Sequence, residues 1–350
     1  MSHRFLTGAT AALISLAVLI PARITGQAPS STAKKSAPGP KSAAAQKGAA
    51  AKPWTPPRTP DGQPDFQGIW AIATLTPLER PAELAGKEFF TEQEAAEYEN
   101  RMLQQVNTDR RSQDSTADLR GNYNEFWRDR GSSIVGSRRT SLIVDPPDGK
   151  IPPLTPETRK RRAGRAGGLP AGPEDLALRI RCISRGLPMV PTPNNNFFEI
   201  VQGAGNVAIL QEMMYEARII PLSGPLDARP HSAPSVRGYM GDARGRWEGD
   251  TLVIDTTNFI GKNDFYGADE NLHLTERLTR TDENTILYKF TVDDPTAFTK
   301  PWSGEIPMRK SQEGIFDYEC HEGNYSIVNI LSGARAAEKA AEQAAQQGQK

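Results

Sequence analysis

Three histidines in the body of the chain, His231, His273 and His321, carry the side chains best suited to moving protons near neutral pH. His231 falls in an expected loop, where functional groups are often displayed, and His273 falls in an expected strand. His321 directly follows Cys320, so a disulfide at that cysteine would hold it in place. All three are therefore candidates for acid–base catalysis, and an ordinary surface or hydrogen-bonding role is the alternative for each.

Glu276 is a fourth candidate because it interrupts an apolar strand face. The period-two alternation of a strand over residues 272–280 puts four side chains on the same face: Leu272, Leu274, Glu276 and Leu278. A carboxylate on such a face is either buried with a partner or aimed into a cavity. A buried Glu276–arginine salt bridge would set the strand register, whereas a cavity would make Glu276 a general acid or base. The salt bridge is the reading that the pattern favours.

The sequence shows no comparably clear pattern for metal binding or phosphate binding. Imidazole and carboxylate suit zinc or iron, and Glu276, Asp255 or Glu322 could join the histidines in such a site. No two histidines share a ligand spacing such as H-x-H or H-x3-H, so we predict no metal and no cofactor. The chain also lacks a phosphate-binding glycine loop, a nucleophile elbow and a zinc-protease helix.

Three tryptophans, Trp70, Trp127 and Trp247, are candidates for binding a small apolar or aromatic ligand, since an indole offers both area and an N–H donor. Trp247 opens the string Trp247-Glu248-Gly249-Asp250-Thr251, in which Gly249-Asp250 makes a tight turn. The alternative for Trp247 is a lid over the core, with the string serving only to nucleate a hairpin.

The elements that position these residues lie between two ends of different character. Arg4 and a mostly apolar run over residues 5–20, followed by small residues, predict a cleavable signal peptide over residues 1–28. An uncleaved membrane helix is the alternative. Residues 29–55 are rich in Ala, Lys, Pro and Ser and predict a disordered linker, and residues 333–350 predict a solvated helical tail. We therefore expect a periplasmic or extracellular protein with no transmembrane anchor after cleavage.

Two cysteines, Cys182 and Cys320, predict one disulfide in an exported chain. Two free thiols or a metal-binding pair are the alternatives. The chain has 42 Lys and Arg against 42 Asp and Glu, and this balance argues against a nucleic-acid partner. The one basic run, over residues 159–162, reads as a solvated loop.

Residues 56–332 predict a single β-rich domain. Thr91 and Glu94 form a capping-box pattern that predicts a helix over residues 91–105. A turn leads into a strand at 64–70, and a Pro/Gly/Arg-rich loop should follow 149 as far as 175. Strands are expected at residues 140–144, 197–201, 206–210 (extending to 220), 250–256, 272–280, 285–293 and 314–320. Strands that follow strands without a βαβ rhythm predict a mainly β fold, an antiparallel meander in a barrel or sandwich with one or two peripheral helices.

Two resemblances accompany this reading. Gly68-Ile69-Trp70 resembles the Gly-x-Trp opening of lipocalins and other calycins, which implies a calycin-like barrel whose tryptophan closes its bottom. Longer stretches resemble a group of uncharacterised secreted bacterial single-domain proteins and imply export but no activity. These stretches are Asn124-Glu125-Phe126-Trp127, Asp145-Pro146-Pro147-Asp148-Gly149, residues 245–253, residues 291–295 and Cys320-His321-Glu322.

Three functions remain open at this point. The first is an exported barrel-like protein that binds a small apolar or aromatic molecule, with no nucleic-acid partner. The second is a secreted hydrolase, lyase or isomerase that uses the histidines and Glu276. The third is a structural or interaction protein of the cell envelope. The sequence leaves the oligomeric state open, and a convergence of two histidines with Glu276 in one cleft would favour the enzyme.

Overall fold

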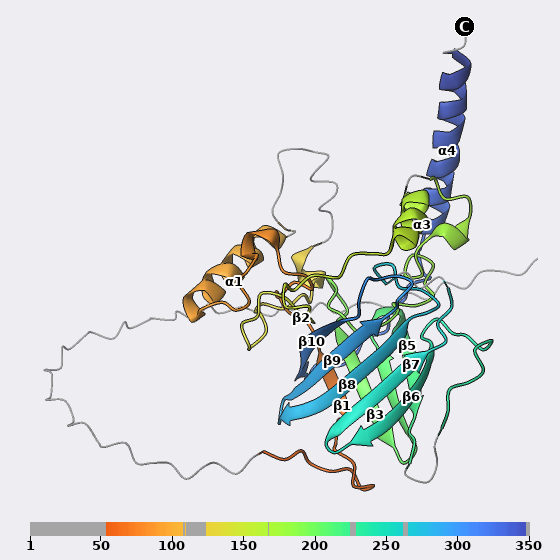
Figure 1. Ribbon diagram of the computed structural model, residues 1–350. Helices are drawn as coiled ribbons and strands as arrows, with labels where there is room; N and C mark the ends of the chain where they lie inside the picture. The colour runs from red at the N-terminus through yellow and green to blue at the C-terminus, as the bar shows by residue number, and fades with distance from the viewer. Residues whose placement is uncertain are drawn as a thin grey trace, which may run out of the picture. The chain divides into compact units, whose positions relative to one another are not determined.

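A computed structural model describes residues 54–107, 109, 124–166, 168–224, 229–261 and 265–347. Its centre is an antiparallel sheet of ten strands that curls into a nearly closed barrel (Figure 1). The strands are β1 (Gly68–Ala71), β2 (Ile143–Asp145), β3 (Phe197–Gly203), β4 (Asn206–Gln211), β5 (Glu216–Pro221), β6 (Asp242–Glu248), β7 (Thr251–Thr257), β8 (His273–Asp282), β9 (Thr285–Asp293) and β10 (Trp302–Lys310). The predicted mainly β, antiparallel fold is confirmed.

The strand order is β5-β4-β3-β1-β10-β9-β8-β7-β6, with β2 paired beside β10. The ends of this order meet where Leu222, just after β5, forms a parallel bridge with Gly245 of β6. A Cβ atom on Gly245 would lie only 2.7 Å from Leu222 Cδ2. The glycine of the Gly245-Arg246-Trp247 string therefore lets the two ends of the sheet approach each other.

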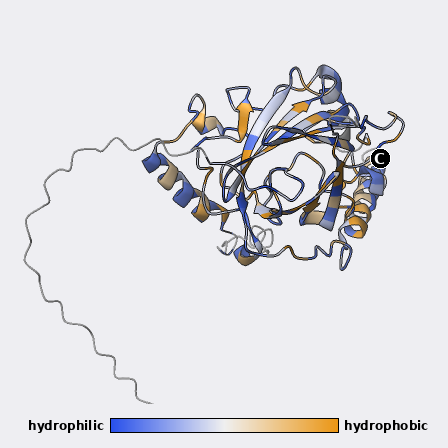
Figure 2. Ribbon diagram, turned by 90° about the horizontal axis from the view of Figure 1, so that it is seen from below, coloured by the Kyte–Doolittle hydropathy of each residue, from blue (hydrophilic) through white to orange (hydrophobic). Residues whose placement is uncertain are grey.

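A cluster of buried apolar side chains forms the core of the barrel, whose backbone Figure 2 shows from below. Alternate residues of each strand point inward, as period-two patterning requires. The largest buried side chains include Trp70, Trp302, Tyr288, Phe198 and Phe290. The segment before β3 adds Leu187 and Met189 to the same core, and the Met189 N–H donates to the Tyr288 hydroxyl over 3.2 Å.

Within the described residues, three α-helices lie outside the barrel: α1 (Glu92–Val106), α3 (Pro156–Ala166) and α4 (Ser326–Gln347). Short 3-10 turns are η1 (Ala82–Leu84), η2 (Glu125–Trp127), η3 (Pro173–Asp175) and η4 (Met213–Tyr215). The predicted capping box of α1 is present, because Thr91 and Glu94 exchange side-chain and backbone hydrogen bonds. Among the helices of the described ranges, none has the length and apolar character needed to cross a membrane.

Several expected elements differ from the structure. The basic run predicted as a loop is the middle of α3, and residues 314–320, predicted as a strand, have no strand pairing. Strands β6 and β10 were not expected, and η4 interrupts the long strand expected from 206 to 220. Helix α4 begins at Ser326, before the predicted start of the tail at 333. The predicted signal peptide and nearly all of the linker lie outside the described residues.

The predicted disulfide is present. Cys182 and Cys320 are joined, with their Cα atoms 5.6 Å apart. The bond ties the segment before β3 to the chain that leads into α4.

Candidate functional site

Two of the predicted histidines meet on one carboxylate at the outer face of the barrel. His231 Nε2 lies 2.8 Å from one oxygen of Asp255, and His273 Nε2 lies 2.6 Å from the other. The register of β7 and β8 pairs Asp255 with Thr275, so His273 lies on the diagonal across that strand pair. The barrel therefore unites residues from a loop and two strands.

His231 also contacts a second carboxylate, since its Nδ1 lies 3.3 Å from Asp242 Oδ2. Asp242 accepts further hydrogen bonds from the Ser232 N–H at 2.7 Å and from Arg244 Nη1 at 2.5 Å. Carboxylate oxygens only accept, so both His231 contacts are hydrogen bonds when the imidazole carries a proton on each nitrogen. This cluster fastens the loop before β6 to the barrel wall.

Hydrogen bonds decide the ionisation of both carboxylates. Burial alone would raise the pKa of Asp255, but hydrogen bonds from His273 and His231 outweigh burial and hold that pKa below its usual value. Burial likewise acts to raise the pKa of Asp242, and the Ser232 N–H and Arg244 lower it overall. Both carboxylates are therefore charged at neutral pH.

Glu276 points into the barrel, on the opposite face of β8 from His273. Its Oε2 lies 2.6 Å from Arg218 Nη1 in an ion pair whose two side chains are almost fully buried. The Tyr288 hydroxyl donates to Glu276 Oε1 over 2.8 Å, and Arg218 Nη2 donates to Thr256 Oγ1 over 2.5 Å. Burial, followed by the charge of Glu276, raises the pKa of Tyr288 well above its ordinary value. Glu276 is thus a partnered core residue here.

The remaining predicted residues do not join these clusters. His321 is exposed, and its backbone carbonyl accepts from the Asn324 N–H over 3.2 Å. The four predicted acid–base residues therefore do not converge in one cleft. Within the described part of the chain, no group of three or more His, Cys, Asp or Glu side chains is arranged to hold a metal ion.

The three candidate tryptophans lie in different surroundings, and none of them is among the residues that line the pocket described below. Trp70 is fully buried and donates through Nε1 to the Phe66 carbonyl over 2.8 Å. Trp247 packs edge-on against Phe66, with ring centroids 5.3 Å apart. Trp127 is exposed beside Phe126. Trp70 and Trp247 therefore contact protein side chains or backbone at Phe66, and binding of a ligand by these tryptophans stays a prediction.

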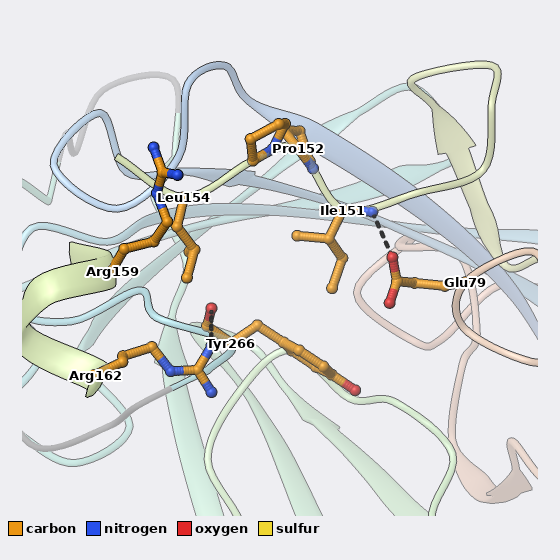
Figure 3. Close-up of a pocket in the computed structure, with 8 residues that line it drawn as sticks. Glu79, Ile151, Pro152, Leu154, Arg159, Arg162 and Tyr266 are labelled. Atoms are coloured by element: carbon orange, nitrogen blue, oxygen red, sulfur yellow. Dashed lines mark hydrogen bonds between the residues drawn. The ribbon is translucent and has the colours of Figure 1, made fainter. Parts of the chain in front are cut away.

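A pocket of about 400 Å³ outside the barrel offers a different site (Figure 3). Figure 3 shows Ile151 and Leu154 on one side of it and the Tyr266 ring on the other. Arg159 and Arg162 enter from α3, and Glu79 lies at the opposite end. We call this pocket the Tyr266 slot; its lining residues are Glu79, Ile151, Pro152, Pro153, Leu154, Arg159, Arg162 and Tyr266.

A buried carboxylate anchors the elements that form the Tyr266 slot. Asp294, 1% exposed, accepts hydrogen bonds from the backbone N–H groups of Asp269, Thr296 and Ala297 and from the Thr296 hydroxyl. Thr155 caps the start of α3, and its hydroxyl donates to the Thr296 carbonyl over 2.7 Å. The Asp293-Asp294-Pro295 string thus joins α3 to the turn that carries Tyr266.

The backbone of Tyr266 is unusual. Its φ is +56°, in the left-handed region that disfavours bulky residues, and Gly267 follows at +119°. Arg162 donates to the Tyr266 carbonyl over 3.2 Å, and Arg161 donates to the Gly267 carbonyl over 2.7 Å. A Cβ on Gly267 would lie 2.8 Å from Leu154 Cδ2, so glycine is needed for this close approach. A strained backbone conformation persists only where surrounding contacts stabilise it, and such conformations are often found at binding sites.

Charge is distributed unequally along the Tyr266 slot. Arg159 is exposed and forms no ion pair with a described residue, whereas Arg162 is engaged at the turn. Glu79 uses Oε1 to accept the Ile151 N–H over 3.0 Å. Burial raises the pKa of Tyr266, and the nearby Glu79 carboxylate adds to that rise, so its phenol is neutral at neutral pH. The slot therefore offers an aromatic face, a positive end and an acceptor end.

Sequence reasoning missed Tyr266, Asp294 and Arg159. One available signal was Gly267, since glycine marks turns in which the backbone takes a positive φ. Arg159 lies in the basic run, which the sequence predicts as a loop and which is part of α3. No signal in the sequence reports that these segments lie together.

Comparisons with known proteins give no relative: no family model, no curated protein and no solved structure matches this chain. The resemblances to calycins and to secreted bacterial proteins therefore remain predictions.

Proposed function

We propose that this chain is an exported barrel-like protein that binds a small planar aromatic molecule bearing an acidic group. The observation that carries the proposal is the Tyr266 ring, held in a left-handed backbone conformation opposite Ile151 and Leu154 with arginines at one end. Export is inferred from the predicted signal peptide and from the disulfide, since such bonds persist in oxidising compartments.

The chemistry of the slot defines the ligand. An aromatic ring between Tyr266 and the aliphatic side chains of Ile151 and Leu154 would gain stacking and apolar burial. A carboxylate on that ring would lie toward Arg159, whose planar fork suits carboxylates. A hydroxyl at the other end of the ring would donate to Glu79 Oε2, the oxygen not used by Ile151. A hydroxylated aromatic acid therefore meets each feature of the slot.

Isothermal titration calorimetry with 4-hydroxybenzoate tests the proposal. We expect binding to weaken in the order 4-hydroxybenzoate, benzoate and cyclohexanecarboxylate, because the series removes the hydroxyl donor and then the planar ring. Tyr266→Leu should abolish detectable binding.

Arg159→Gln should weaken binding by roughly 2–5-fold, as expected for a contact with a partly solvated charge. Lys160→Gln removes the same charge from the next position of α3, which does not line the slot, and should change binding little. Equal affinities for benzoate and cyclohexanecarboxylate, or equal effects of the two α3 variants, would contradict the proposal.

A second candidate function, acid–base catalysis by a secreted hydrolase, rests on His231 and His273 sharing Asp255. A carboxylate that orients an imidazole is a recurring arrangement in such enzymes. Hydrolysis of 4-nitrophenyl esters that is lost in His273→Gln but kept in His321→Gln would support it. Equal rates in the two variants would rule out this use of the cluster.

A further inference from the structure

The outer face of strands β3, β4 and β5 is apolar. Alternate side chains of these strands, such as Phe198 and Ile220, point inward and belong to the barrel core. The side chains between them point outward, and those of Val201 and Ile219 are 50% and 59% exposed. The strand register places Val201, Ala208 and Ile219 in one row across the three strands. We call this surface the apolar wall, and its central outward side chains are Glu199, Val201, Ala208, Leu210, Ala217 and Ile219.

The opposite wall of the barrel has the charged outer face that is usual in water. The strand order places β8 across the barrel from β4. On that side Arg277 pairs with Glu248 over 2.8 Å, and Lys289 pairs with Glu305 over 2.5 Å. On the apolar wall, Glu199 is the one charged outward side chain in the described strands β3 to β5. Antiparallel sheets usually place polar residues on a solvated face, so a wall without them indicates a surface that contacts another molecule.

The chain after β10 crosses one end of the apolar wall and leaves the row across the strands accessible. A hydrogen bond joins the Phe316 backbone to the Glu212 carboxylate just after β4, and another joins Asp317 to the Tyr215 hydroxyl. The side chains of Phe316 and Tyr215 are themselves exposed and extend the apolar surface at this end. The two branched aliphatic side chains of the row stay at least half exposed.

The shape of the apolar wall suits a second copy of itself. A two-fold axis brings the same patch of two chains together. Facing sheets pack about 10 Å apart by interdigitating their side chains. Ala208 and Ala217 are small and lie beside the larger Ile219, so an isoleucine of one copy fits the hollow of its partner.

The charges at the two ends of the apolar wall fit the same arrangement. Glu199 lies near Tyr215 at the end where β3 begins, close enough to interact with its hydroxyl. Arg229 lies beside Gly205, in the turn that joins β3 to β4 at the opposite end. A two-fold axis that lies between the walls and runs across the strands reverses the strand direction of the second copy. The acidic end of one copy then meets the basic end of its partner.

We propose that the chain forms a two-fold dimer in which two apolar walls pack face to face. Three strands of six or seven residues, about 4.8 Å apart, make a central contact of roughly 300 Å² per copy. A standard interface buries about 800 Å² per partner, so the exposed aromatic side chains and the charged ends must form its rim. A contact of this size predicts a dimer that dissociates at micromolar concentration. The dimer uses no residue of the Tyr266 slot and does not depend on the function proposed for it.

Analytical ultracentrifugation of the oxidised full chain tests the dimer. Between about 1 and 200 µM we expect the average mass to rise from that of one chain toward that of two. Ile219→Glu places a charge in the centre of the contact and should raise the dissociation constant at least about tenfold. Val236→Glu is the matched control, because Val236 is 60% exposed and lies in the loop before β6, outside the wall. A wild-type mass that stays at one chain throughout this range, or equal effects of the two variants, would overturn the proposal.

A second variant keeps the test decisive if Ile219→Glu fails to fold. Val201→Glu changes the same row on β3 and should also favour the single chain, whereas Tyr266→Leu should leave the dimer unchanged. Flotation with phosphatidylglycerol vesicles distinguishes the dimer from a wall that binds lipid. A wild-type chain that is monomeric and floats with the vesicles, and loses this flotation in Ile219→Glu, would assign the wall to lipid and overturn the dimer.

Discussion

Removing one partner of the buried Arg218–Glu276 pair should strongly destabilise the protein. The Glu276 side chain is fully buried, that of Arg218 is 4% exposed, and the two charges lie 2.6 Å apart. In Arg218→Met, the hydrogen bond from Tyr288 is the one that the Glu276 carboxylate would keep among the described residues. An uncompensated buried charge typically costs about 3–5 kcal/mol in the free energy of unfolding. At 2–4 °C per kcal/mol, the melting temperature should fall by roughly 6–20 °C.

The double variant Arg218→Met/Glu276→Leu provides the decisive comparison. Removing both charges eliminates the uncompensated carboxylate, so the unfolding free energy should return to within about 1–2 kcal/mol of the wild-type value or exceed it. Urea unfolding at pH 7, followed by tryptophan fluorescence, measures all the variants on one scale. A cost below about 1 kcal/mol for Arg218→Met, or additive costs in the double variant, would show that Glu276 does not depend on Arg218 for its charge compensation.

Three further predictions concern other parts of the molecule. Cys320→Ser opens a bond that spans 138 residues and should lower the unfolding free energy by up to about 5 kcal/mol in the chain-entropy model, measured by urea unfolding without reductant; an unchanged midpoint would contradict it. Asp255 has a lowered folded-state pKa, so its stabilisation is present above the unfolded value near 4 and is lost as the pH falls through the folded value. Asp255→Asn should therefore flatten the fall in melting temperature on acidification below pH 4, and a variant with the wild-type slope would show that Asp255 is not responsible. Gly245→Ala should lower the free energy of unfolding by about 1–3 kcal/mol, because its Cβ would clash with Leu222. Gly314→Ala has no atom within 4 Å of the new Cβ and should be neutral. Equal melting temperatures of the two variants would exclude close packing between Gly245 and Leu222.

The strands that could be predicted from the sequence are those with strong apolar alternation, such as β8 and β9. Strand β6 escaped prediction because its inward positions include Ala243 and Gly245, which are too small to give an apolar pattern. Strand β10 contains Gly304 and Pro307, which normally argue against a strand. Residues 314–320 resemble a strand locally, but no neighbouring strand pairs with them, and pairing is a property of the whole fold.

The candidate sites depend even more on tertiary structure. The alternation of β8 predicts that His273 and Glu276 lie on opposite faces, yet only the barrel register brings Asp255 beside His273. Helix α3 has no apolar stripe, and its hydrogen bonds to the Tyr266 turn help to hold it in place. The sequence offers Trp70 and Trp247 as ligand contacts, and in the structure both contact Phe66. Which side chains pack together in a core depends on every strand, and no single segment reports it.

Binding at the Tyr266 slot can be observed directly by NMR on a methyl-labelled sample titrated with 4-hydroxybenzoate. We expect saturable shifts of the Ile151 and Leu154 methyl groups, which line the Tyr266 slot, and little change at the buried Leu187 methyls of the barrel core. These shifts should disappear in Tyr266→Leu. Shifts centred on Leu187 would instead place the ligand inside the barrel, and the absence of any shift at millimolar ligand would contradict binding of this class of molecule.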